Sequence, residues 1–200
     1  MFEPSPQLYL ASASPRRQAL LAQIGIRFKT IEVNTPEMPG EGESPEEFAI
    51  RVARDKAIAG CEALGTSTLI PVLGADTVVV VDNQILGKPK NRQDSLTMLE
   101  RLSGRSHHVL TAVAVRNSHK FKSLVSRSTV TFRASTPAER EAYWATGEPR
   151  DKAGGYAIQG LAAIFVAYLE GSYTGVMGLP LYETAQILTE FNVQILRLQA

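Results

Sequence analysis

The stretch IPVLGADTVVVV at residues 70–81 carries most of the information about the fold. Its β-branched run predicts a buried strand, and Asp82-Asn83 is a turn signal that would pair it with 84–86 as a hairpin. A carboxylate at Asp76, inside such a strand, costs free energy unless it is paired, hydrogen-bonded or metal-bound. The alternative is an aspartate at a strand end that faces water, with Gly74 allowing a local bulge. Both interpretations stay open.

Strands and helices alternate on either side of this stretch, which is the pattern of an α/β protein. Capping-box sequences begin two of the helices, at Ser44-Pro45-Glu46-Glu47 and Thr136-Pro137-Ala138-Glu139. The hairpin at Asp82-Asn83 and a second one, in which 109–115 and 124–132 are joined across 117–119, argue against a purely parallel sheet, so we expect a mixed one. The remaining expected strands are 8–12, 28–33, 109–115, 124–132 and 161–169, and the expected helices are 15–24, 45–64, 91–103, 137–146 and 179–191.

Length and composition limit the classes of protein to consider. The 200 residues include one cysteine, Cys61, which allows no internal disulfide and no thiolate metal cluster. With 21 basic and 20 acidic residues, the net charge of +1 argues against nucleic-acid and membrane partners. The first residues lack the features of a secretory signal, and no apolar run is long enough to span a bilayer. We expect one domain over 1–200, located in the cytoplasm.

The common catalytic motifs are absent from the sequence, including the phosphate-binding P-loop, the H-E-x-x-H zinc motif and the G-x-S-x-G nucleophile elbow. His107, His108 and His119 fall at a strand edge and a hairpin tip, where we expect surface or edge residues. A histidine triad or a zinc site is therefore disfavoured. The chemistry would depend on carboxylates, lysines, arginines and a hard metal ion.

The segment Ser12-Ala13-Ser14-Pro15-Arg16-Arg17 joins an expected strand to a helix. A helix N-terminus exposes backbone N–H groups, and with two hydroxyls and two guanidiniums it would form a phosphate site. The alternative is an ordinary capped helix with a solvated arginine pair, and this segment taken alone favours that alternative.

Two further segments carry candidate residues. The acidic loop holds Glu37, Glu41 and Glu43, of which most are expected to be solvated. One carboxylate would reach a metal held by Asp76, because Mg²⁺ favours one or two carboxylates plus substrate phosphates. The glycine-rich segment 151–160 is either a plain turn between a helix and a strand or a loop that covers a ligand. Lys56 and Lys88, each taken alone, are expected at the surface.

Taken together, these segments resemble the Maf family of nucleoside triphosphate pyrophosphatases. The resemblance spans nearly the whole chain, from Leu8–Arg17 to Gly178–Glu183. It implies a two-lobed α/β fold around a mixed sheet, with a nucleotide cleft between the lobes. The intervening blocks, in the family's order, are Arg54–Ala57, Leu73–Thr77, Gly87–Pro89, Leu102–Gly104 and Asp151–Gly160.

The resemblance also implies residue roles. In the family, the residue at the position of Asp76 is the proton acceptor, and the residues at the positions of Arg16, Thr77 and Gln159 are associated with the choice of base. The three residues found here are similar to those of the subgroup that acts on dTTP and UTP. The sister subgroup, which acts on methylated guanine nucleotides, carries Trp, Gln and Glu at these three positions. The chain departs from the family pattern at Gly87, where Glu is more common, and this weakens any role for that position.

The implied reaction is hydrolysis of dTTP or UTP to the monophosphate and pyrophosphate, extending to modified pyrimidine nucleotides, with Mg²⁺ or Mn²⁺ as cofactor. Asp76 and Glu37 would hold the metal. Whether Asp76 acts as the base, as a metal ligand or as both stays open. A non-catalytic nucleotide-binding regulator of cell division and a plain phosphate-binding module are the alternatives, and a homodimer is an open oligomeric state. The expected phosphate-binding residues are Ser12, Ser14, Arg16, Arg17, Lys56, Lys88 and Lys152.

Overall fold

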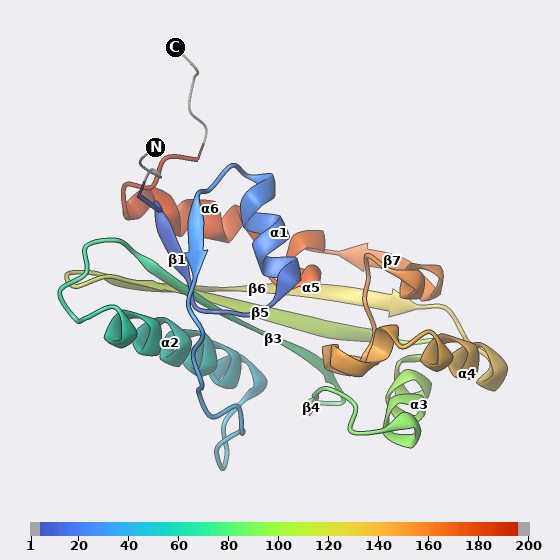
Figure 1. Cartoon of the computed structure of the whole chain (residues 1–200). Coiled ribbons are helices and arrows are strands. Elements are labelled where there is room, and N and C mark those ends of the chain that lie inside the picture. Colours follow the sequence, from blue (N-terminus) through green and yellow to red (C-terminus); the bar gives the residue numbers. More distant parts are fainter. Residues whose placement is uncertain (1–4, 196–200) are drawn as a thin grey trace. The chain divides into compact units, whose positions relative to one another are not determined.

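The computed structural model describes residues 5–195, and its centre is a seven-stranded mixed sheet flanked by helices (Figure 1). The strand order is β2-β1-β3-β5-β6-β7, with β4 paired to β3. Strand β1 is parallel to β2 and β3, whereas β4 is antiparallel to β3 and β7 to β6. The expected α/β class and mixed sheet are confirmed. The strands are β1 Leu8–Leu10, β2 Phe28–Thr30, β3 Val72–Val81, β4 Gln84–Leu86, β5 Ser106–Arg116, β6 Phe121–Phe132 and β7 Val166–Glu170.

Four helices begin at or next to the residues that the sequence signals predict, at Pro15, Pro45, Arg92 and Pro137, whereas the helix expected from 179 begins at Leu181. Ser44 and Thr136 each accept a hydrogen bond from the backbone N–H three residues on, so both capping boxes are formed. The hairpin turn is also confirmed, because Asp82 and Asn83 have positive φ values of 51° and 58°. The helices are α1 Pro15–Gln23, α2 Pro45–Ala63, α3 Arg92–Leu102, α4 Pro137–Ala145, α5 Tyr173–Met177 and α6 Leu181–Glu190, with 3₁₀ turns η1 Glu148–Asp151, η2 Ala153–Gly155 and η3 Leu161–Phe165.

The chain packs as two compact units. Within the described residues, the first comprises 5–76, 111–125 and 178–195, and the second comprises 77–110 and 126–177. The first unit holds β1, β2, α1, α2 and α6, and the second holds β4, β7 and α3 to α5. Strands β3, β5 and β6 each contribute residues to both units.

In the first unit, α2 packs closely on β3 because both elements carry small residues where they meet. Ala53 and Ala57 of α2 are fully buried. A Cβ atom placed on Gly74 of β3 would lie 2.3 Å from the Ala53 carbonyl oxygen and 2.7 Å from the Ala57 nitrogen. The glycine thus allows near contact between the two backbones.

The core of the second unit is rich in aromatic rings. His107 lies in it at 2% exposure, with Nε2 2.8 Å from the Tyr156 hydroxyl and its ring edge-on to Phe132. Burial lowers the pKa of His107 to about 4. The expectation that this histidine is a surface or edge residue is therefore wrong, since its strand begins at Ser106 and its side chain faces inward. Helices α3 and α4 lie side by side in the same unit (Figure 1).

One expected element differs from the structure, and one element of the structure was not expected. Residues 161–165 form the 3₁₀ turn η3 in place of a strand, and β7 begins only at Val166. The Glu148 carboxylate accepts hydrogen bonds from the backbone N–H groups of Leu161 and Ala162, which bends the chain there. The short helix α5 was not expected, because its five residues are too few to show a helical pattern of apolar residues. It follows Gly171, whose φ is 110°.

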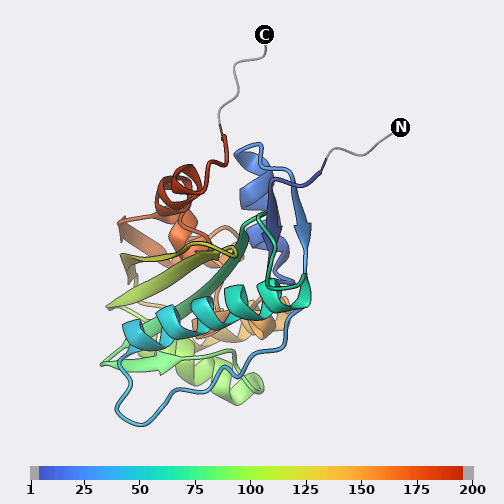
Figure 2. The ribbon, with the colours of Figure 1, turned by 90° about the vertical axis from the view of Figure 1, so that its left-hand side faces the viewer.

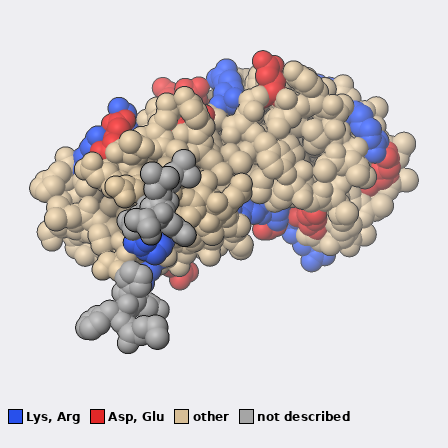
Figure 3. All heavy atoms as spheres, turned by 90° about the horizontal axis from the view of Figure 1, so that it is seen from above, with Lys and Arg blue, Asp and Glu red and all other residues tan. Residues whose placement is uncertain are grey.

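Charged side chains are spread over the face shown in Figure 3, where basic and acidic groups are interspersed. This agrees with the near-balance of 21 basic and 20 acidic residues. Among the helices of the described residues, none combines the length and the apolar composition needed to cross a membrane.

Candidate active site

Asp76 and Lys56 form a buried ion pair in the first unit. Asp76 is 8% exposed, and its Oδ1 accepts a hydrogen bond of 2.9 Å from the Lys56 Nζ. The same ammonium lies 2.6 Å from Oε1 of Glu37, a half-exposed side chain of the loop before α2. One buried cation therefore bridges two carboxylates. The water-facing interpretation of Asp76 and the surface position expected for Lys56 are both wrong.

Burial raises the pKa of Asp76 above its ordinary value. The positive charges of Lys56 and Arg17 act against this rise, and so does the hydrogen bond from Lys56. A carboxylate with a raised pKa binds a proton more readily than an exposed aspartate does. The position therefore suits a group that accepts a proton from water.

The Ser12–Arg17 segment places hydroxyl and guanidinium groups at the N-terminus of α1. Ser14 is the N-cap residue, yet its side chain makes no capping hydrogen bond. Ser12 Oγ accepts hydrogen bonds of 3.2 Å from the Ser14 N–H and from Nη1 of Arg17. Arg17 also donates through Nε to the Gly178 carbonyl at 2.8 Å. The segment is thus a fixed corner at a helix start, with Arg16 half-buried beside it.

Arg17 is electrostatically linked to the carboxylates. Burial lowers the pKa of its guanidinium, and the negative charges of Asp76 and Glu37 act in the opposite direction. The structure therefore brings Arg17, Lys56, Asp76 and Glu37 close to one another. Arg17 is therefore not one of a solvated arginine pair, and Ser14 does not cap the helix through its side chain, so the ordinary capped helix does not describe this segment.

The loop that carries Glu37 is held by a pair that the sequence analysis missed. Arg51 of α2 donates to both carboxylate oxygens of Glu43, at 2.6 and 2.8 Å, and to the Met38 carbonyl at 2.9 Å. Glu43 in turn accepts from the Gly40 N–H, and the Arg51 hydrogen bond lowers the pKa of Glu43 to about 2. Glu43 is therefore not a solvated loop residue, whereas Glu41 is exposed. Figure 2 shows the loop running beside α2.

The remaining predicted site residues belong to the second unit. Lys88 and Gln159 are exposed, Thr77 is half-buried at the residue after Asp76, and Lys152 pairs with Asp151. The Gly154 N–H donates to the Gly87 carbonyl at 3.0 Å, which ties the glycine-rich loop to the residue before Lys88. A Cβ on Gly154, whose φ is 68°, would lie 2.9 Å from Val79. The close approach of the loop backbone to Val79 thus explains why position 154 is a glycine.

The sequence also matches known proteins over most of its length. A family model described as Maf-like protein matches residues 7–191. The chain is a member of the Maf family. Among curated relatives of this Maf protein, a dTTP/UTP pyrophosphatase of Alkalilimnicola ehrlichii is 55% identical over 195 residues, covering 96% of each chain. One of Saccharophagus degradans, with the same name, is 50% identical and covers 96% of this chain and 91% of that protein.

Among solved structures, the Maf protein is similar to the Ham1 protein of Staphylococcus aureus, with a TM-score of 0.41 and 12% identity. The similarity covers 62% of this chain and 71% of that one.

The donor set of the Maf protein fits a hard divalent cation bound with substrate. Asp76 and Glu37 both reach the Lys56 Nζ, at 2.9 and 2.6 Å, so their carboxylates lie close together. Within residues 5–195, no group of three or more His, Cys, Asp or Glu side chains forms a metal site. Mg²⁺ is commonly bound by one or two carboxylates, with phosphate oxygens and waters as its remaining ligands.

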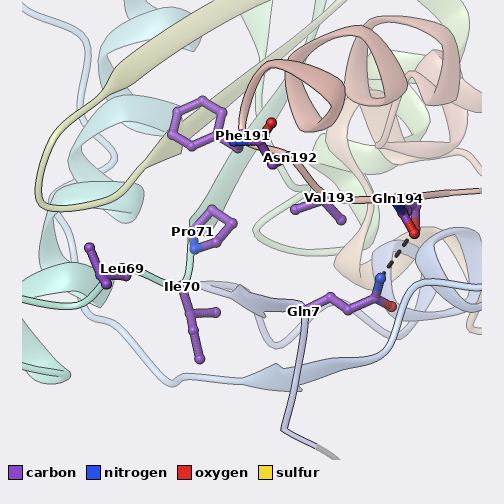
Figure 4. Close-up of a pocket in the computed structure, with 8 residues that line it drawn as sticks. All are labelled: Gln7, Leu69, Ile70, Pro71, Phe191, Asn192, Val193 and Gln194. Atoms are coloured by element: carbon purple, nitrogen blue, oxygen red, sulfur yellow. Dashed lines mark hydrogen bonds between the residues drawn. The ribbon is translucent and has the colours of Figure 1, made fainter.

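The first unit also contains a pocket that none of these site residues lines. It has a volume of about 280 Å³ and is lined by Gln7, residues 69–71 and residues 191–194 (Figure 4). Its lining residues carry no charged side chain. A triphosphate requires cations, so this pocket does not suit the phosphate chain of a nucleotide.

Proposed function

We propose that this Maf protein hydrolyses dTTP and UTP to the nucleoside monophosphate and pyrophosphate. The observation that carries the proposal is the Glu37–Lys56–Asp76 cluster, in which a buried ammonium bridges two carboxylates. The names of the relatives, at 50% and 55% identity, supply the substrates. The reaction is a water attack on phosphorus, which needs charge neutralisation, a base and an aligned leaving group.

Asp76 is the proposed proton acceptor. The attacking water gives a proton to Oδ1 or Oδ2 while its oxygen bonds to the α-phosphorus. The bond from the α-phosphorus to the bridging oxygen breaks, and pyrophosphate leaves. Burial, which raises the pKa of Asp76, favours this proton transfer.

The cations of the first unit would neutralise the phosphates. Lys56 Nζ is already placed between two carboxylates, and Arg17 is fixed by hydrogen bonds to Ser12 and the Gly178 carbonyl. Fixed donors need little reorganisation when the charge of the transition state develops. Ser14 and Arg16 complete the proposed phosphate site, and Lys88 and Lys152 are proposed as further phosphate-binding cations.

Asp76 and Glu37 would also hold a Mg²⁺ or Mn²⁺ ion. When bound, such an ion neutralises phosphate charge and acidifies a coordinated water. Arg16, Thr77 and Gln159 are the proposed base-selecting residues. We also expect the protein to act in the cytoplasm. Its substrates would be free nucleotides, including modified pyrimidine nucleotides, because its balanced charge does not favour binding to nucleic acid.

Product analysis tests the proposal. Purified protein is mixed with dTTP or UTP and Mg²⁺ or Mn²⁺, and the products are separated by ion-exchange chromatography. We expect monophosphate and pyrophosphate in equal amounts. Nucleotide binding without pyrophosphate release under either metal would contradict the proposal and favour the regulator alternative.

A further inference from the structure

One carboxylate of the second unit organises the segment that carries Gln159. Glu148, the first residue of η1, accepts hydrogen bonds through Oε2 from the Leu161 N–H at 3.0 Å and through Oε1 from the Ala162 N–H at 3.3 Å. Oε1 also accepts from the Tyr143 hydroxyl at 2.7 Å. Glu148 therefore fixes the chain immediately after Gln159.

Tyr143 fixes the chain before Gln159. Its hydroxyl accepts a hydrogen bond of 3.2 Å from the Ala157 N–H, so its single proton is donated to Glu148. The ring is 4% exposed and packs edge-on against Phe165, with ring centroids 5.5 Å apart. Two linked side chains thus hold residues 157 and 161–162, while Gln159 between them is exposed.

Gly160 shows how closely the carboxylate approaches the segment. A Cβ on this residue would lie 2.3 Å from Oε2 of Glu148. The carboxylate reaches the two N–H groups only because position 160 has no side chain. Neither Glu148 nor Tyr143 takes part in the proposed reaction itself.

We infer that Glu148, acting directly on Leu161 and Ala162 and through Tyr143 on Ala157, is a positioning residue that holds Gln159 for base selection. This inference rests on the proposed function, in which Gln159 contacts the base. Uracil and thymine present an acceptor at O4 beside a donor at N3, whereas cytosine presents a donor at N4 beside an acceptor at N3. A glutamine amide can match either pattern if it is free to reverse. Glu148 and Tyr143 hold the backbone on both sides of Gln159, and this backbone sets where the amide meets the base.

Glu148→Gln is the direct test. All three partners of Glu148 are donors, and a glutamine replaces one acceptor oxygen by an NH₂ group, so at least one hydrogen bond is lost without a change of size. We expect KM for UTP and dTTP to rise about 10-fold with kcat changed by less than about 3-fold, because binding and not chemistry is affected. We expect the ratio of kcat/KM for UTP over CTP to fall about 10-fold.

Two further variants complete the experiment. Tyr143→Phe removes only a hydroxyl and should change the UTP/CTP ratio in the same direction, so it provides the test even if Glu148→Gln does not fold. The double variant should be no worse than the stronger single one, because both act on one network. Glu141→Gln is the matched control, since Glu141 pairs with Arg92 on the surface and has no bond to 157–162 among the described contacts.

The outcomes separate this inference from the proposed function. If the wild-type protein releases no pyrophosphate, the proposed function fails and this inference fails with it. If the wild type is active but Glu148→Gln and Tyr143→Phe lower kcat/KM for UTP, dTTP and CTP equally, only the inference is overturned, because a purely structural role affects all nucleotides alike. A changed UTP/CTP ratio with an unchanged control supports it.

Discussion

Asp76 and Lys56 are 20 residues apart, yet they share a hydrogen bond of 2.9 Å in a buried site. The sequence shows that a carboxylate at position 76 needs a partner, because an unpaired buried charge is costly. It does not show which of the lysines or metals is that partner. The answer depends on the packing of α2 against β3, which no local pattern specifies. Glu37 and Arg17 were predicted for the same site for chemical reasons, and the structure groups them with this pair.

The first prediction concerns Asp76→Asn, which removes the charge and keeps the size. Loss of the base should lower kcat/KM for UTP by about 10²–10⁴-fold. Burial raises the pKa of Asp76, so the folded protein holds this proton more tightly than the unfolded chain. The charged carboxylate therefore lowers stability as pH rises above its usual pKa, and asparagine removes that cost. We expect a melting temperature at pH 7 no lower than that of the wild type.

Calorimetry and steady-state kinetics on the same preparation check this pair of effects. Asp82→Asn is the matched control: it removes a surface ion pair with Arg105, and asparagine tolerates the positive φ of 51°. That variant should keep its activity. An Asp76→Asn protein destabilised by about 3–5 kcal/mol would mean that the pair is mainly structural. A turnover number near that of the wild type would exclude Asp76 as the base.

The second prediction concerns Gln159→Glu. The amide of Gln159 can donate to O4 and accept from N3–H of uracil or thymine, whereas a carboxylate only accepts. A lone pair then faces O4, and kcat/KM for UTP and dTTP should fall about 10–100-fold, whereas kcat/KM for GTP should rise only slightly. Comparison of kcat/KM for the three nucleotides checks it. An equal loss for all of them would exclude base recognition by Gln159.

At the scale of elements, local chemistry specified most of the fold. Capping boxes and the Asp82-Asn83 turn predicted the starts of α2 and α4 and the β3–β4 hairpin, because each signal acts within a few residues. Residues 161–165 were predicted as a strand and form η3. That error arose because the carboxylate that satisfies their N–H groups lies 13 residues earlier, at Glu148. The Arg51–Glu43 pair was missed since it joins a helix to a loop of irregular structure.

The third prediction concerns the contact between α2 and β3. In Gly74→Ala the new methyl group would lie 2.3 Å from the Ala53 carbonyl oxygen, so the helix must move. We expect a loss of about 1–3 kcal/mol in the free energy of unfolding, as for other overpacked cores. Since Lys56 lies on the same helix, its bond to Asp76 should lengthen and kcat/KM should fall.

Chemical denaturation and kinetics test this prediction. Gly87→Ala is the control for stability, because a Cβ at position 87 meets no atom within 4 Å and the residue has no positive φ. If Gly74→Ala were as stable as Gly87→Ala, the close packing of α2 on β3 would not be the constraint that fixes Lys56.

At the scale of the whole molecule, the chain builds two units from interleaved segments. The first unit draws on 5–76, 111–125 and 178–195, and the second on the segments between. Alternating strands and helices predicted the α/β class, since that pattern is local. The division of β3, β5 and β6 between units depends on contacts between distant segments, so the sequence pattern could not show it. We propose one reaction for this chain, the attack of water on the α-phosphorus of a pyrimidine nucleoside triphosphate.

Hydrolysis of UTP in ¹⁸O-labelled water, followed by mass spectrometry of both products, tests that claim most directly. Attack at the α-phosphorus places the water oxygen in the monophosphate, because the bond to the bridging oxygen breaks and pyrophosphate leaves with its own oxygens. We predict one labelled oxygen in UMP and none in pyrophosphate, with dTTP giving the same result. Label in pyrophosphate, or release of orthophosphate in its place, would contradict the account.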